Sequence, residues 1–149
     1  HSLVGNGKDY EKVKNTSHNR SINRHKWDYT ELQRQLASPY SQHTKVHDRI
    51  IKLLNIRKEQ PAFHPNATQF TLQLGEQIFG FWRQSMDRRQ SIFCIYNVSD
   101  EMQIIRLSDL NLIGTDNWLD LISGHTLSLE DLEYQLTPYQ SMWISNISS

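Results

Sequence analysis

The sequence has one cysteine, no net charge and no long apolar run, and each shortage excludes a class of protein. Cys94 alone forms no internal disulfide and no thiolate metal cluster, which favours a reducing, cytoplasmic compartment. Sixteen basic residues balance sixteen acidic ones, so no long-range field attracts nucleic acid or an anionic membrane. No segment approaches the ~20 consecutive apolar residues that span a bilayer. We therefore expect neither nucleic acid nor a membrane as a partner.

The start of the chain predicts a fragment. Residues 1–5 form neither a charged-then-apolar signal peptide nor an initiator sequence, because they open on histidine and lack methionine. The 149 residues nevertheless suffice for one ordinary domain, or for a small domain with an appendage. Composition changes near Pro61: residues 6–60 are polar, while residues 67–146 hold most aromatic and β-branched side chains. This change predicts two parts, 1–60 and 61–149.

The first part contains helix signals. Residues 3–5 read as the tail of a short buried strand, and residues 8–14 as a helical turn or two. Asp28 is an expected N-cap for a helix over 29–37, with Glu31 at the capping-box position.

A longer helix is expected over 41–59, with Ser41 as its cap and Pro61 as its stop. Its apolar residues form a wide stripe, typical of a helix that covers a sheet or barrel wall: Val46, Ile50, Ile51, Leu53, Leu54 and Ile56. Since such a stripe needs a cover, we expect self-association, a tight local repacking or a missing companion chain.

The second part alternates in polarity as strands do. The first hairpin pairs 70–74 with 78–82 through a two-residue Gly75-Glu76 turn, and Met86-Asp87 lies in the next turn. Further strands are predicted at 91–98, 102–107, 118–122, 125–129 and 141–144. Seven or eight short strands with closely spaced turns predict a mainly β fold, an antiparallel sandwich.

Side chains that donate hydrogen bonds are most closely spaced between Asn19 and His25. Arg20, Asn23 and Arg24 lie there as well, and a guanidinium can hydrogen-bond vicinal sugar hydroxyls or hold a carboxylate that does so. A solvated basic loop with one structurally paired arginine explains the same pattern. The residues alone leave both interpretations open.

The segment Asn19-Arg20-Ser21-Ile22-Asn23-Arg24-His25 resembles a motif of the sucrose phosphorylase-like enzymes, a branch of the α-amylase clan (glycoside hydrolase family thirteen). The resemblance extends to residues 2–10, the helix at 41–59 and the segment Phe63-His64-Pro65. It also includes residues 136–144, which are similar to the last strand of the family. It implies that residues 1–60 are the end of strand eight, the loop and the helix eight of a catalytic (β/α)8 barrel. Residues 61–149 would be the antiparallel β domain that follows.

The resemblance also implies an activity for a longer parent enzyme. Such enzymes are retaining: a carboxylate attacks the anomeric carbon, a second acts as acid and base, and a phosphorylase uses inorganic phosphate as co-substrate without a cofactor. These acids would lie on earlier barrel strands, so this chain alone would not be catalytic. Arg20 matches the arginine that helps hold the glucosyl ring of a small carbohydrate substrate. Asn19, Asn23, Arg24 and His25 share its loop.

One departure bears on the substrate. Sucrose phosphorylases commonly have glycine before this arginine and aspartate after it, where this chain has Asn19 and Ser21. That pattern looks closer to relatives acting on other glucosides, such as glucosylglycerate.

Other features admit two interpretations. His43 and His47 have the spacing of two zinc ligands, but no third ligand is evident, which favours packing or solvation. A sugar-stacking platform could use Trp82, Trp118, Trp143 and Tyr139, although a core role is typical of such aromatics. Cys94 lies between apolar neighbours and is expected to be an inert packing thiol.

Two non-enzymatic hypotheses are alternatives to the phosphorylase-like interpretation. Residues 63–149 could be a stand-alone carbohydrate-binding sandwich, which requires exposed, coplanar aromatics on one face. The chain could also be a structural module that binds no ligand.

Overall fold

The structure is a computed structural model that describes residues 2–110, 117–128 and 133–147. The chain forms two compact units, His1–Asn55 and Ile56–Ser149. Each is described by itself. No helix among the described residues is long and apolar enough to cross a membrane.

Short helical elements make up the first unit. In chain order they are the 3₁₀ turn η1 (Ser2–Val4), α1 (Tyr10–Thr16), the 3₁₀ turn η2 (Asn19–Asn23), α2 (Tyr29–Ala37) and most of α3 (Gln42–Lys58). The strand tail predicted at residues 3–5 is wrong. Gly5 closes a 3₁₀ turn there at φ 59°, since no described strand of this unit offers a ladder to join.

The predicted helix starts are confirmed. The Asp28 carboxylate accepts the Glu31 backbone N–H at 3.0 Å, and the Ser41 hydroxyl accepts that of His43 at 3.2 Å. Glu31 does not complete a capping box. Its carboxylate instead accepts two bonds from the Arg34 guanidinium, which hold its pKa at about 2.

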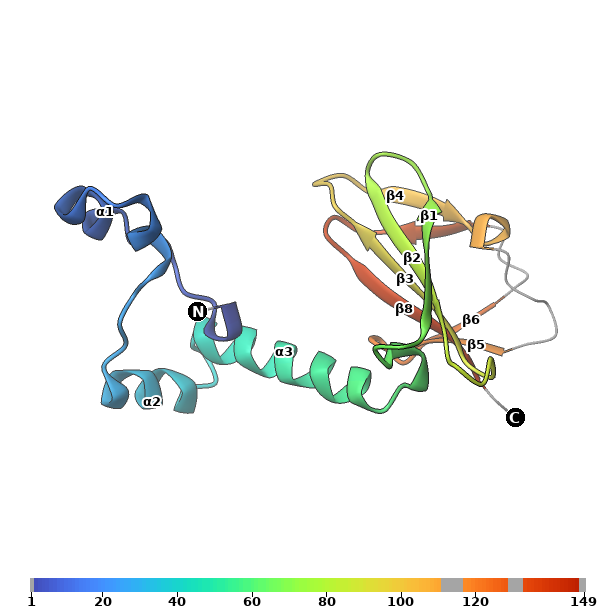
Figure 1. Cartoon of the computed structure of the whole chain (residues 1–149), viewed down its shortest axis with the longest axis horizontal. Coiled ribbons are helices and arrows are strands. Elements are labelled where there is room, and N and C mark those ends of the chain that lie inside the picture. The colour runs from blue at the N-terminus through green and yellow to red at the C-terminus, as the bar shows by residue number, and fades with distance from the viewer. Residues whose placement is uncertain (1, 111–116, 129–132, 148–149) are drawn as a thin grey trace. The chain divides into compact units, whose positions relative to one another are not determined.

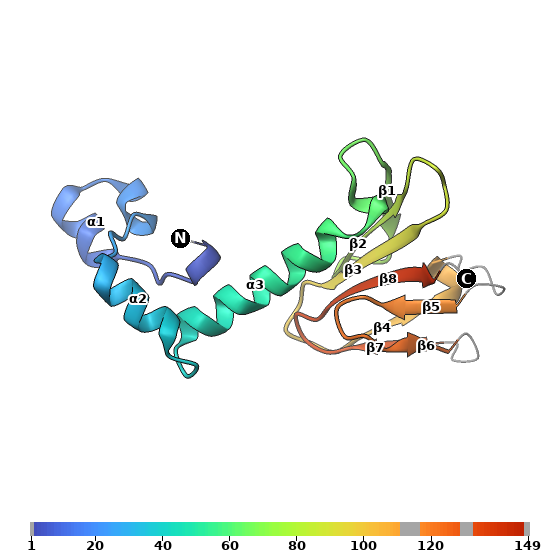
Figure 2. The ribbon, with the colours of Figure 1, turned by 90° about the horizontal axis from the view of Figure 1, so that it is seen from below.

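The second unit is an antiparallel β fold, as predicted. One sheet has the order β1-β2-β3-β8-β5-β6, and β4 pairs with β7 in a second sheet (Figures 1 and 2). The strands are β1 (Thr68–Gln73), β2 (Ile78–Gln84), β3 (Ser91–Asn97), β4 (Gln103–Arg106), β5 (Asn117–Asp120), β6 (Thr126–Leu127), β7 (Glu133–Leu136) and β8 (Ser141–Ile147). The 3₁₀ turns η3 (Pro61–Phe63) and η4 (Leu107–Leu110) complete this unit.

Three details differ from the sequence prediction. Gln73 pairs with Phe79, so residues 74–77 connect the first hairpin rather than Gly75-Glu76 alone. The strand β7 was not predicted. The strand predicted at 125–129 shortens to β6, and Leu129 lies outside the described residues.

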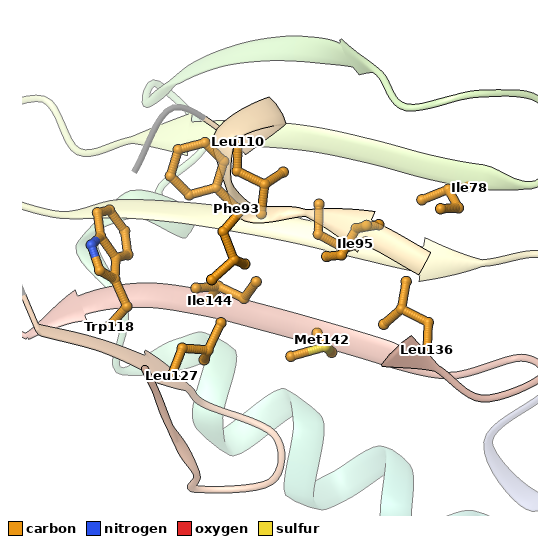
Figure 3. Close-up of a cluster of buried hydrophobic side chains, with 11 residues drawn as sticks. Ile78, Phe93, Ile95, Leu110, Trp118, Leu127, Leu136, Met142 and Ile144 are labelled. Atoms are coloured by element: carbon orange, nitrogen blue, oxygen red, sulfur yellow. The ribbon is translucent and has the colours of Figure 1, made fainter. Parts of the chain in front are cut away.

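The core lies on the inner face of the six-stranded sheet. Alternate residues of β2, β3 and β8 meet side chains from the second sheet and from η4 (Figure 3). Fully or nearly fully buried members include Ile95, Leu110, Leu136, Met142 and Ile144. Burial of this apolar surface is the main force that holds the two sheets together.

Two buried polar side chains secure the loops at the ends of the sheet. The Asp120 carboxylate accepts backbone N–H groups from Trp143 (2.9 Å), Ile122 (3.2 Å) and Ser123 (3.2 Å). The Asn97 amide donates to the backbone oxygens of Glu101 (2.7 Å) and Thr137 (2.9 Å). Both side chains are almost fully buried, so each substitutes for backbone partners that the turns lack.

Asp120→Ala is expected to lower the free energy of unfolding by about 3 kcal/mol, because it strands the buried Trp143 N–H and two loop N–H groups. Asp120→Asn retains one acceptor oxygen and should lose clearly less. Urea unfolding followed by tryptophan fluorescence measures both losses. Equal stability of the Ala variant and the unsubstituted chain would contradict the anchoring role.

Cys94 is fully buried on β3, as predicted for a packing thiol. Burial raises the thiol pKa from its ordinary 9.0 to about 12. Because the folded pKa exceeds the unfolded one, this group's contribution to stability is complete below pH 9 and is lost as the pH rises toward 12.

We therefore expect native Cys94 to resist a thiol reagent such as DTNB at pH 8 and to react fully in denaturant. The native thiol has almost no thiolate at that pH and no access to the reagent. Colour release with and without urea measures this difference. Rapid stoichiometric release from the native chain would show that β3 is not buried.

Candidate functional site

The predicted sugar-binding loop is η2, which follows α1 after a sharp turn at Ser17 (φ 54°). Two bonds to its backbone hold the loop against α1. The Asp9 N–H donates to the Ile22 backbone oxygen at 2.9 Å, and the Lys12 ammonium donates to the Arg24 backbone oxygen at 2.6 Å. The Thr16 hydroxyl of α1 also donates to the Ser21 hydroxyl at 2.9 Å. These bonds use the loop backbone and Ser21, so the side chains of Asn19, Arg20 and Asn23 take part in none of them.

Four of the five predicted site residues lie together. Two open depressions flank η2: Asn19, Arg20 and Arg24 line both, and Asn23 lines one of them. All four side chains are exposed. The loop thus gathers two amides and two guanidinium groups at one surface.

Neither guanidinium of the loop is used structurally within the described chain. Among the residues that the structure describes, Arg20 and Arg24 make no side-chain hydrogen bond and no ion pair. The alternative interpretation requires an ion-pair partner for one of these arginines, and the described residues supply none. Each planar group keeps its donors free for a hydroxyl, carboxylate or phosphate.

The fifth residue, His25, lies in a different place. Its ring meets Trp27 edge-on at 5.0 Å and lines a depression with Asn6, Trp27 and His43. The indole N–H of Trp27 donates to the Asn6 side-chain oxygen at 2.8 Å. The structure therefore does not bring His25 together with Arg20, although the two are close in sequence.

The two histidines with metal-ligand spacing have other contacts. His43 Nδ1 lies 2.6 Å from the Val4 backbone oxygen, and its ring packs on Trp27 at 4.9 Å. His47 Nδ1 lies 3.1 Å from the Asp48 carboxylate. Within the described ranges, no three histidine, cysteine or acidic side chains are grouped as metal ligands would be.

The tryptophans of the β unit are core residues, as favoured from the sequence. Trp118 and Trp143 are buried, and Trp82 stacks on Phe93 at 6.2 Å within the core. Tyr139 is exposed but occupies a left-handed turn position. A tryptophan platform for stacking sugars is thereby excluded, since two of its three rings cannot be reached.

The chain is similar in sequence to three bacterial glucosylglycerate phosphorylases. No family model matches the chain. The glucosylglycerate phosphorylase of Allomeiothermus silvanus is 34% identical over 97% of this chain, and that of Spirochaeta thermophila is 30% identical over 97%. The Escherichia coli enzyme of the same name is 28% identical over 96%. The chain spans only about a quarter of the length of these relatives (23%, 26% and 24%).

Solved structures of similar fold include an α-amylase and a maltose complex. AmyP bound to maltose matches 70% of this chain with a TM-score of 0.58 at 18% identity, over 21% of its own length. An Anoxybacillus α-amylase matches 70% with a TM-score of 0.59 at 17% identity, over 23% of its length. At these identities the likeness is one of fold. Over nearly its whole length the chain is thus similar in sequence to glucosylglycerate phosphorylases, and over most of it similar in fold to α-amylase structures, which agrees with the family resemblance of the segment 19–25.

Proposed function

We propose that this chain is the C-terminal part of a retaining glucosyl phosphorylase that acts on glucosylglycerate or a related α-glucoside. The observation that carries the proposal is the near-complete alignment with glucosylglycerate phosphorylases from three bacteria. The departure from the sucrose phosphorylase motif at Asn19 and Ser21 favours the same substrate class. Inorganic phosphate is the proposed co-substrate.

In this proposal residues 1–60 complete a (β/α)8 barrel and residues 61–149 form the β domain that follows it. Residues 2–5 form a 3₁₀ turn, so the last barrel strand would end before Ser2. The chain would supply one substrate-binding loop and no reacting carboxylate, because the catalytic acids belong to earlier barrel strands. The enzyme therefore requires the remainder of a phosphorylase-length polypeptide.

Arg20 is the proposed substrate-holding residue. Its exposed guanidinium has no other partner in the described chain and can donate parallel bonds to glucosyl hydroxyls or to a carboxylate that orients them. Asn19, Asn23 and Arg24 border the same depressions and would add donors around it. His25, packed on Trp27, would act on the position of the loop rather than on the sugar.

The test uses a hybrid enzyme, in which this chain replaces the matched quarter of the A. silvanus phosphorylase. Arg20→Ala is expected to lower kcat/KM for glucosylglycerate phosphorolysis about 100-fold, because one directional contact to the glucosyl group is lost. Released glucose 1-phosphate measures the rate.

A matched control removes an exposed arginine from the β unit. Arg88 lies in the β2–β3 turn at φ 61°, a conformation that asparagine tolerates, so Arg88→Asn should leave phosphorolysis unchanged. Near-normal activity of the Arg20→Ala hybrid would remove this arginine from the mechanism. An unsubstituted hybrid that folds but fails to phosphorolyse the substrate would count against the proposed activity.

A further inference from the structure

Trp27 lies where three segments of the first unit meet. Its indole N–H donates to the Asn6 side-chain oxygen at 2.8 Å. The rings of His25 and His43 contact it edge-on, with centroids at 5.0 Å and 4.9 Å and interplanar angles of 82° and 88°. One half-buried side chain thus joins the segment before α1, the stretch that leaves η2 and the first turn of α3.

The segment before α1 is itself fixed to α3. The Val4 backbone oxygen lies 2.6 Å from His43 Nδ1. Gly5 adopts φ 59°, and a Cβ atom at this position would lie 2.9 Å from a methyl group of Val46. Because glycine has no Cβ and tolerates positive φ, the backbone can approach the helix this closely. The acceptor of the indole N–H is the next residue along this fixed backbone.

The stretch that leaves η2 depends on the Trp27 side chain. The bonds from Asp9 and Lys12 to the loop backbone end at the Arg24 oxygen. Within the described ranges, the backbone of residues 25–27 makes no hydrogen bond to the rest of the chain. The contacts of the Trp27 ring and its N–H are therefore what fixes the chain between η2 and α2.

This tryptophan does not border the predicted sugar-binding surface. Neither of the two depressions beside η2 is lined by Trp27, whereas Arg20 lines both. Any effect of the indole on a ligand bound there must therefore pass through the position of the loop.

We propose that Trp27, held by Asn6, is a positioning residue that acts on the substrate through Arg20. This inference rests on the proposed function, since only there does Arg20 hold the glucosyl group. The Arg20 side chain has no partner among the described residues, so the backbone of η2 determines where its guanidinium lies. A displacement of about 1 Å in such a group can lower a rate on the order of 100-fold.

The test is a double-variant cycle in the hybrid enzyme. Trp27→Ala is expected to lower kcat/KM for glucosylglycerate phosphorolysis roughly 50-fold, because the loop loses its anchor. In a hybrid that already carries Arg20→Ala, the same substitution should cost no more than about 5-fold, since the group on which Trp27 acts is absent. Released glucose 1-phosphate measures the four rates. Equal factors in the two backgrounds would overturn the proposal.

Two milder variants isolate the indole hydrogen bond. Trp27→Phe keeps an aromatic ring between the histidines and removes the donor, and Asn6→Ala removes the acceptor. Each should lower kcat/KM about 5-fold, which is the usual worth of one such bond. The double variant should be no slower than the slower single one, because both changes remove the same bond. Losses that multiply would contradict the anchor.

Trp143→Phe is the matched control, since it also removes an indole donor. The Trp143 N–H donates to the Tyr96 hydroxyl at 2.9 Å within the β unit. This variant should lower Tm but leave kcat/KM within about 2-fold of the unsubstituted hybrid. A loss of activity as large as that of Trp27→Phe would mean that lower stability explains both results, and the positioning role would be lost.

The isolated 149-residue chain gives a readout that needs no activity. The Asp9 N–H donates to the Ile22 oxygen at 2.9 Å, so its exchange with deuterium reports whether η2 stays attached to α1. Trp27→Ala should accelerate this exchange at least about 5-fold and Trp143→Phe should leave it unchanged, as measured by NMR.

The two proposals fail separately. Unchanged Asp9 exchange in Trp27→Ala would overturn the anchor even if the hybrid is active. An unsubstituted hybrid that folds without activity would instead remove the proposed function, and accelerated exchange would still support Trp27 as the residue that holds η2.

Discussion

The pairing of β3 with β8 is the interaction on which the β unit depends. Five residue pairs, from Ile92–Ser145 to Tyr96–Ser141, join strands that begin 50 residues apart in sequence (Ser91 and Ser141) and place both at the centre of the sheet. The inner residues of these strands form the middle of the core. Asn97 lies at one end of this pair and donates to the backbone of the loop before β8, while Asp120 of β5 binds the Trp143 N–H in the middle of β8. Loss of the pairing would separate β1, β2 and β3 from β8, β5 and β6.

The two faces of this sheet have different roles. The inner face is saturated by the second sheet and η4, and it accounts for the stability of the unit. The outer face is closed by η3 at one end and ends in exposed rings at the other. In the first unit the division is similar at smaller scale: the backbone of η2 is bound to α1, while its guanidinium groups point to solvent. In both places structural contacts are made by one set of groups, and a separate set faces solvent.

The sequence predicted elements whose signals are local. The Asp28 cap needs only the Glu31 N–H three residues on, and β3 holds an unbroken apolar run over residues 92–95, so its burial follows from the pattern. The sequence-based prediction failed where contacts with residues distant in sequence determine the structure. β7 carries Glu133 and Gln135 on its outer side and too few apolar residues to stand out, and it becomes a strand because β4 pairs with it. For the site, the pattern identified the dense group of donors but not that His25 turns to Trp27, since a ring contact sets that direction.

The central position of β8 has a consequence for biosynthesis. At about 5–20 residues per second, a ribosome needs roughly 2–10 seconds to extend the chain from the end of β3 to the end of β8. Throughout that interval the β1–β2–β3 meander has emerged with one open edge and one uncovered apolar side, a state prone to pair with neighbouring nascent chains. The yield of native protein in a cell should therefore depend on how long the ribosome takes to translate residues 98–140. It should also depend on chaperones that bind the unpaired edge of β3 during that time.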